Sequence, residues 1–166
     1  MPRRQSVSME KGDAQRRLEG HYKFVVEERA LEREKRDRCV LQPWSSMGIA
    51  IDGSDQLSFG IPAFRELSKD DCGKVRMRNH LEIVQVTGSP KKVNIFVVPE
   101  DIPPDANVTV EVLQRTLKRE ERHRGGSLPK ILYLQMDNCR GTNKNTATFS
   151  YLFNLVERQV FDFIFV

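Results

Sequence analysis

Two carboxylates, Asp52 and Asp137, each follow a short apolar run in the sequence. Both runs, residues 46–51 and 131–136, are typical of buried strands. A carboxylate at the end of a buried strand is costly to leave unpaired, and a divalent cation is a common partner. If the two strands are parallel neighbours, both carboxylates leave the same edge of one sheet. A pair of Mg²⁺ or Mn²⁺ ions held there would support in-line displacement at phosphorus, as in nucleic-acid strand cleavage.

The same residues also suit a purely local role in turns and helix caps. Asp and Asn favour turns because their side chains bond to nearby backbone groups, and Asp52-Gly53 is a common turn dipeptide. Either Asn143 or Asn145 could cap the helix expected after residue 145. The metal site and the turn remain alternatives at this point. Asp55 is the alternative to Asp52 as the first carboxylate, because it lies in the same short segment.

The periodicity of the chain predicts an α/β domain with five strands in a mixed sheet, in the order β-β-β-α-β-α-β. The predicted strands are 46–52, 81–87, 92–98, 131–136 and 161–166, and the second and third form a hairpin. The predicted helices of this domain are 107–122, with Val110, Leu113 and Leu117 as its apolar face, and 146–159, with Phe149, Leu152, Phe153 and Val156. Residues 57–74 are interpreted as a loop with at most a short helix, because glycines and a proline interrupt them.

The first 42 residues differ from the rest and are expected to form a charged helical arm. Residues 21–38 predict a helix whose mixed charges permit several pairs four residues apart. A solvated helix and an arm that contacts a partner or a phosphate backbone are both compatible with this pattern. Pro43 marks the boundary, so we expect a second domain over 43–166.

Composition limits the class of protein. The 166 residues are 39% hydrophobic and 30% charged, with a net charge of +4 that permits nucleic-acid binding. Three cysteines and three histidines are scattered, so neither a zinc site nor a disulfide framework is expected. No apolar run is long enough to cross a membrane, and the N-terminus has no apolar signal core. We therefore expect an intracellular protein, in the nucleus rather than the cytoplasm, with no membrane partner.

Two segments resemble a known but uncharacterised family. Ile51-Asp-Gly-Ser-Asp-Gln56 and Leu134-Gln-Met-Asp-Asn-Cys-Arg-Gly-Thr-Asn-Lys-Asn145 resemble a ribonuclease H-like domain of mobile-element origin. Its fold is shared by DDE transposases and retroviral integrases, and the resemblance covers about residues 46–166. It implies a ribonuclease H-like fold in which Asp52 and Asp137 are catalytic and bind Mg²⁺ or Mn²⁺ as a two-ion site. It also places Asn138 beside the second ligand.

Further residues are candidates in the light of this resemblance. Arg140 and Lys144 flank the second carboxylate and could contact a nucleic-acid phosphate, although a solvated surface position is the alternative. Glu111 lies on the helix where ribonucleases H carry a metal-binding Glu. Asp162 lies on the last strand, where a position on its solvent side is the simpler interpretation.

The resemblance also implies what this chain does. In the family a third acidic segment follows the fifth strand, whereas this sequence stops at Val166, so we expect a C-terminally incomplete domain that is inactive as this fragment. The expected parental activity is metal-dependent DNA strand cleavage and transfer by a transposase. One alternative is a non-catalytic module that binds nucleic acid or protein, and another is a ribonuclease or exonuclease of the same fold. The expected partner is nucleic acid, DNA rather than RNA, and a homo-oligomer is compatible with the sequence.

Overall fold

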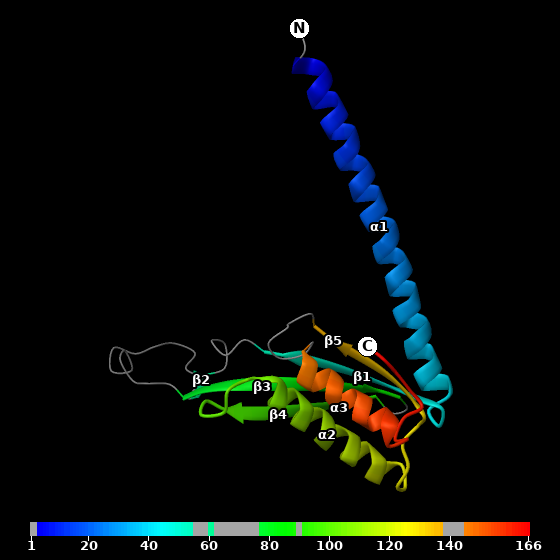
Figure 1. The fold of residues 1–166 in the computed structure, drawn as a ribbon, viewed down its shortest axis with the longest axis vertical. Coiled ribbons are helices and arrows are strands. Elements are labelled where there is room, and N and C mark those ends of the chain that lie inside the picture. Colours follow the sequence, from blue (N-terminus) through cyan, green and yellow to red (C-terminus); the bar gives the residue numbers. More distant parts are fainter. Residues whose placement is uncertain (1–2, 55–59, 62–76, 89–90, 138–144) are drawn as a thin grey trace. The chain divides into compact units, whose positions relative to one another are not determined.

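The computed structural model describes residues 3–54, 60–61, 77–88, 91–137 and 145–166 (Figure 1). The chain divides into two compact units, Met1–Asp37 and Arg38–Val166. The first helix, α1, runs over Arg3–Leu41 and therefore begins well before the predicted start at residue 21. Side chains at 13–37 are exposed apart from a half-buried Val25, and the exposed ones include the apolar Leu18, Tyr22, Phe24, Val26 and Leu31. Among the described residues, no helix is both long and apolar enough to cross a membrane.

The second unit is built on a mixed, open sheet. Its main strands are β1 (Ser46–Gly53), β3 (Met77–Thr87), β4 (Lys92–Pro99), β5 (Ile131–Met136) and β6 (Phe163–Phe165). They lie in the order β4-β3-β1-β5-β6. Antiparallel pairing joins β4 to β3 and β3 to β1, whereas β1–β5 and β5–β6 are parallel. The predicted α/β class, the five strands and the hairpin are confirmed.

One further strand was not predicted. Strand β2 (Gly60–Ile61) pairs with Met77 and Arg78 at the start of β3, inside the segment interpreted as a loop. Two residues carry too little periodicity to distinguish a strand from a loop. The remainder of that segment lies outside the described residues.

Two helices, α2 (Ala106–His123) and α3 (Thr146–Glu157), lie on the same side of the sheet (Figure 1). Alternate strand residues point toward them, because side chains of a strand alternate between its two faces. The core therefore draws on every second residue of three central strands: Met47, Ile49, Ile51, Val84, Val86, Leu132, Leu134 and Met136. Asp105 is the N-cap of α2, and its carboxylate accepts bonds from the backbone N–H groups of Asn107 and Val108. Its buried stripe includes the predicted Leu113 and Leu117.

The apolar face predicted for α3 is only partly correct. Leu152 is buried as expected and Val156 is half-buried, but Phe149 and Phe153 are 45% and 64% exposed. The buried positions are instead Thr148, Leu152 and Leu155, which share one face at helical spacing. The two phenylalanines made the adjacent face look more apolar than the face that packs.

The last turn of α1 belongs to the second unit. Cys39 is only 1% exposed and lies against Gly48 of β1, where an added Cβ would be 3.6 Å from its Sγ atom. Burial raises the pKa of the Cys39 thiol, and the effects of Ser46, Arg124 and Arg38 oppose that shift. Arg38 also donates a hydrogen bond of 3.2 Å to the Tyr133 hydroxyl on β5. These contacts attach the last turn of α1 to the face of the sheet opposite α2 and α3.

Candidate metal centre

Strands β1 and β5 are parallel neighbours, and they end at the same edge of the sheet. Their register pairs Ile49 with Leu134 and Ile51 with Met136. Asp52 and Asp137 each follow the last of these pairs by one residue. Neighbouring strands in a sheet lie about 4.8 Å apart. Strands β1 and β5 are therefore paired in the way that a site built from these two carboxylates requires.

Asp52 points to the face of the sheet opposite α2 and α3, and Asp137 directly follows the neighbouring strand β5. Ile51 and Met136 are buried in the core, on the side of α2 and α3. Since successive side chains of a strand point to opposite faces, Asp52, the next residue of β1, points away from the core. Asp52 and Asp137 are accordingly both exposed. A cation at this edge would thus be reached from solvent.

The backbone beyond Asp52 is held in place by neighbouring β3. The Ser54 N–H donates to the Leu81 carbonyl at 2.8 Å, and the Leu81 N–H donates to Ser54 Oγ at 3.1 Å. Gly53 lies opposite Glu82 in the register. These contacts fix the end of β1 even though Asp52 itself is open to water.

A buried His80–Glu82 pair lies beside Gly53 on the core face. His80 Nε2 is 2.7 Å from Glu82 Oε1, and Glu82 is only 3% exposed. Within the described part of the chain, His80 Nδ1 and Glu82 Oε2 have no hydrogen-bond partner. A Cβ at Gly53 would come within 3.0 Å of His80 Cε1, so the glycine makes room for the imidazole. This pair lies on the opposite face of the sheet from Asp52. It contacts the site through Gly53, the residue of β1 that follows Asp52.

The His80–Glu82 pair was not predicted, because the strand was expected to begin only at residue 81. Once β3 begins at Met77, His80 and Glu82 continue the alternation of Val84 and Val86 on the buried face. Polar residues at buried positions of an alternating strand were the available signal.

The other candidates either have basic partners of their own or lie outside the described residues. Glu111 is exposed on α2 and pairs with Arg115, whose Nε is 2.6 Å from Oε1. Asp162 is exposed and lies 3.8 Å from Lys130 Nζ. The remaining candidates fall outside the described part of the chain: Asp55, Asn138, Arg140 and Lys144.

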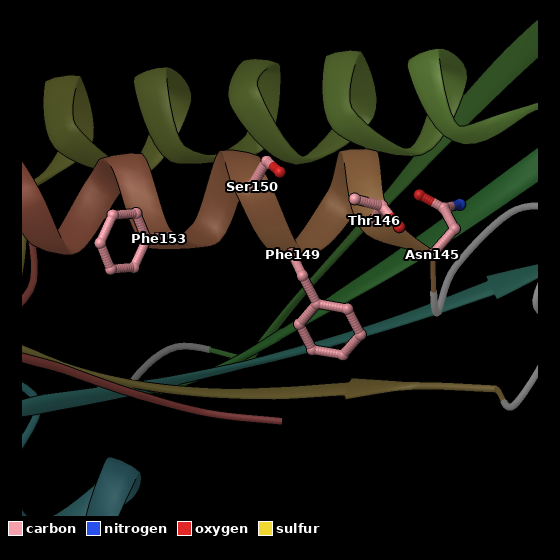
Figure 2. Close-up of a pocket in the computed structure, with 5 residues that line it drawn as sticks. All are labelled: Asn145, Thr146, Phe149, Ser150 and Phe153. Atoms are coloured by element: carbon pink, nitrogen blue, oxygen red, sulfur yellow. The ribbon is translucent and has the colours of Figure 1, made fainter.

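Helix α3 begins close in sequence to Asp137. Asn145 is its N-cap and accepts a bond of 3.0 Å from the Thr148 N–H, which confirms one of the two predicted caps. Asn143 lies outside the described residues. A groove of about 620 Å³ runs along this helix and is lined by Asn145, Thr146, Phe149, Ser150 and Phe153. Figure 2 shows the two phenylalanine rings on the side of α3 away from α2.

The chemistry of the two carboxylates fits a hard divalent cation. Among the described residues, no group of three or more His, Cys, Asp or Glu side chains could hold a metal ion. Mg²⁺ commonly takes only one or two protein carboxylates, and water or substrate oxygens complete its octahedral shell. Asp52 and Asp137 meet that requirement in number and type, whereas a site for zinc would need additional nitrogen or sulfur ligands.

The Arg38–Val166 unit is an α/β domain with a mixed open sheet and helices on one face. The chain belongs to the family of a domain of unknown function, DUF7869, whose family model matches residues 69–166. The matched segment contains Asp137, both helices and β3 to β6, and it begins after Asp52. No curated protein and no solved structure matches the chain.

Proposed function

We propose that this chain is a transposase-derived, ribonuclease H-like domain that binds a divalent cation through Asp52 and Asp137 and binds DNA, and that its parental activity is metal-dependent DNA strand cleavage and transfer. The observation that carries the proposal is the parallel register of β1 and β5, which ends one residue before each carboxylate. The strand succession, with a crossover helix before β5 and another before β6, is also what that fold requires. A net charge of +4 favours a polyanionic partner.

The proposed chemistry begins with cation binding at the edge of the sheet where β1 and β5 end. Asp52 and Asp137 hold the ion from two adjacent strands, and their exposure leaves its other positions open to water and to a phosphate of DNA. A cation bound there would polarise the phosphate and lower the pKa of an attacking water. The described residues bring two carboxylates to this edge, so we propose cation and DNA binding, without strand cleavage, for residues 1–166 alone.

The first prediction concerns the two carboxylates. Asp52→Asn and Asp137→Asn each remove one anionic ligand, so each should weaken Mn²⁺ binding at least about tenfold, since one charge-assisted contact contributes more than 1.4 kcal/mol. Titration of free Mn²⁺ by electron paramagnetic resonance measures the affinity directly. Asp162→Asn is the matched control, because Asp162 is exposed beside Lys130 and away from this edge. Unchanged Mn²⁺ affinity in both site variants would contradict the proposal.

Incubation with labelled DNA separates binding from cleavage. We expect salt-sensitive binding of labelled DNA, because phosphate contacts release counterions, and intact DNA after incubation with Mn²⁺. Cleavage that disappears in Asp52→Asn would instead show a complete active site in these residues. Equal binding of RNA and DNA would favour the alternative of a ribonuclease-type or general nucleic-acid module.

A further inference from the structure

Strand β4 forms an open edge of the sheet. Within the described residues, β3 is the only strand that pairs with the backbone of β4, along the register from Asn79–Pro99 to Val86–Lys92. An edge strand presents a row of backbone N–H and C=O groups that can pair with another strand. Natural edges are usually short, charged or interrupted, but here the interior of an eight-residue strand carries neither charge nor proline.

A row of apolar side chains lies along β4, on the face of the sheet opposite α2 and α3. Val93, Ile95 and Val97 alternate along β4 and are 56%, 62% and 60% exposed. The row continues onto β3, where Ile83 is the register partner of Ile95 and is also exposed. Contiguous exposed β-branched side chains of this kind mark an interaction surface, because exposure of such an apolar patch is unfavourable.

The sequence of the edge is complementary to itself in one orientation. If two β4 strands run antiparallel and are centred on Ile95, then Ile95 meets its own copy and Val93 meets Val97 at both ends. Lys91 precedes the strand and Glu100 follows it, and both are exposed. In the antiparallel arrangement Lys91 lies opposite Pro99 of the other copy, the residue before Glu100, so each lysine is close to a glutamate, whereas a parallel arrangement would place like charges together.

We propose that two copies of this chain associate through β4, antiparallel and centred on Ile95, so that the two sheets continue into one. The interface is isologous, since the same strand contributes the same residues from both copies. Pro99 has no N–H group and limits the ladder to the residues before it. The surface is distinct from Asp52 and Asp137, which lie on β1 and at the end of β5, so the inference does not depend on the proposed function.

Cross-linking tests both the partner and the register, and it forms the second prediction. In a background with Cys72→Ser and Cys139→Ser, Ile95→Cys should form a covalent dimer on mild oxidation. Val93→Cys and Val97→Cys should cross-link when mixed, and neither should do so alone, because only opposite residues have Cβ atoms about 4.5–5.5 Å apart. Cys39 is buried and does not compete. Equal cross-linking of Val93→Cys with itself would overturn the proposed register.

Association without a cross-link is measured by sedimentation velocity over a range of concentrations. Ile95→Lys should weaken dimerisation about tenfold or more, equivalent to about 1.4 kcal/mol, because two lysines would face each other at the centre. Phe153→Lys is the control, since Phe153 is equally exposed but lies on α3. Lys91→Glu should also weaken the dimer, and Lys91→Glu with Glu100→Lys should restore it. Circular dichroism confirms the fold of each variant, and a folded protein that stays monomeric at every concentration would refute the dimer.

Discussion

At the scale of single residues, the end of β1 depends on a glycine. A Cβ at Gly53 would be 3.0 Å from His80 Cε1 and 3.2 Å from Nε2. The imidazole cannot move aside freely, because its Nε2 is held 2.7 Å from the buried Glu82 carboxylate. The residue after Asp52 is therefore constrained by side chains on the opposite face of the sheet.

The third prediction follows from this contact. Gly53→Ala should lower the free energy of unfolding, because overpacking strain costs about 1–3 kcal/mol and exceeds the ~0.4–1 kcal/mol gained from a less flexible unfolded chain. Urea denaturation measures the change. In a His80→Ala background the clash is absent, so the same substitution should be neutral or stabilising there. An equal loss in both backgrounds would show that the imidazole is not the cause.

Residue-scale features were unequally predictable from sequence. The positions of Asp52 and Asp137 at strand ends could be predicted, because each follows an apolar run directly. The role of Gly53 could not, since it depends on His80, which lies on another strand. Burial of Phe149 and Phe153 was predicted from their large apolar side chains, and this prediction was wrong. Which face of α3 is buried depends on how the helix packs on its neighbours, and the sequence alone does not fix that packing.

At the scale of elements, the C-terminal end of α2 is attached to the sheet by charged groups. The buried Glu120 carboxylate lies 3.0 Å from Lys92 Nζ on β4 and 3.5 Å from Arg124 Nε at the helix cap. Arg124 also donates a bond of 2.6 Å to the Pro43 carbonyl before β1. One carboxylate therefore connects α2 and β4 and, through Arg124, the segment that enters β1.

The fourth prediction tests this connection. Lys92→Met should destabilise the protein by about 2 kcal/mol, less than the ~3–5 kcal/mol expected when a buried charge loses its only partner, because Arg124 remains. The double variant Lys92→Met, Glu120→Met should recover most of that loss, since it removes both charges and fills the site with apolar groups. Thermal or urea unfolding of the wild type, Lys92→Met, Glu120→Met and the double variant gives the coupling energy between Lys92 and Glu120. A coupling near zero would mean that the pair contributes no stability.

Elements were predicted best where the local pattern agreed with the tertiary contacts. Strand β5 has the predicted bounds, because its run is apolar except for Gln135 and is followed directly by the charged Asp137. Helix α2 was predicted to within one residue at each end. Strand β2 escaped prediction because it exists only through its pairing with Met77 and Arg78. Long-range pairing of this kind leaves no periodic signal in two residues.

At the scale of the whole molecule, the boundary between the two units lies inside α1. The first unit ends at Asp37, and the next residues, Arg38 and Cys39, contact the sheet of the second. A boundary placed at Pro43 from sequence marks the end of the helix, because proline disfavours helical conformation before it. The last turn of α1 thus continues the backbone of the helix, but its side chains pack in the second unit.

The fifth prediction compares two truncations. Residues 38–166 should unfold with a free energy within about 0.5 kcal/mol of the full chain, because surface changes away from the core have small effects. Residues 43–166 should be less stable by about 1–2 kcal/mol, since that chain loses the burial of Cys39 and exposes apolar surface. Urea denaturation followed by the circular dichroism of the sheet measures both. Equal stability of the two truncations would show that the last turn of α1 does not support the domain.

The parallel pairing of β1 with β5 also has a consequence for the order of folding. The hairpin of β3 and β4 joins segments that are close in the chain, so its loop closes at small entropic cost. The β1–β5 contact has a much larger sequence separation, and such non-local contacts slow folding. During synthesis β1 leaves the ribosome early, and its partner β5 follows only after α2. The edge that carries Asp52 and Asp137 is therefore completed only after β3, β4 and α2 have been translated.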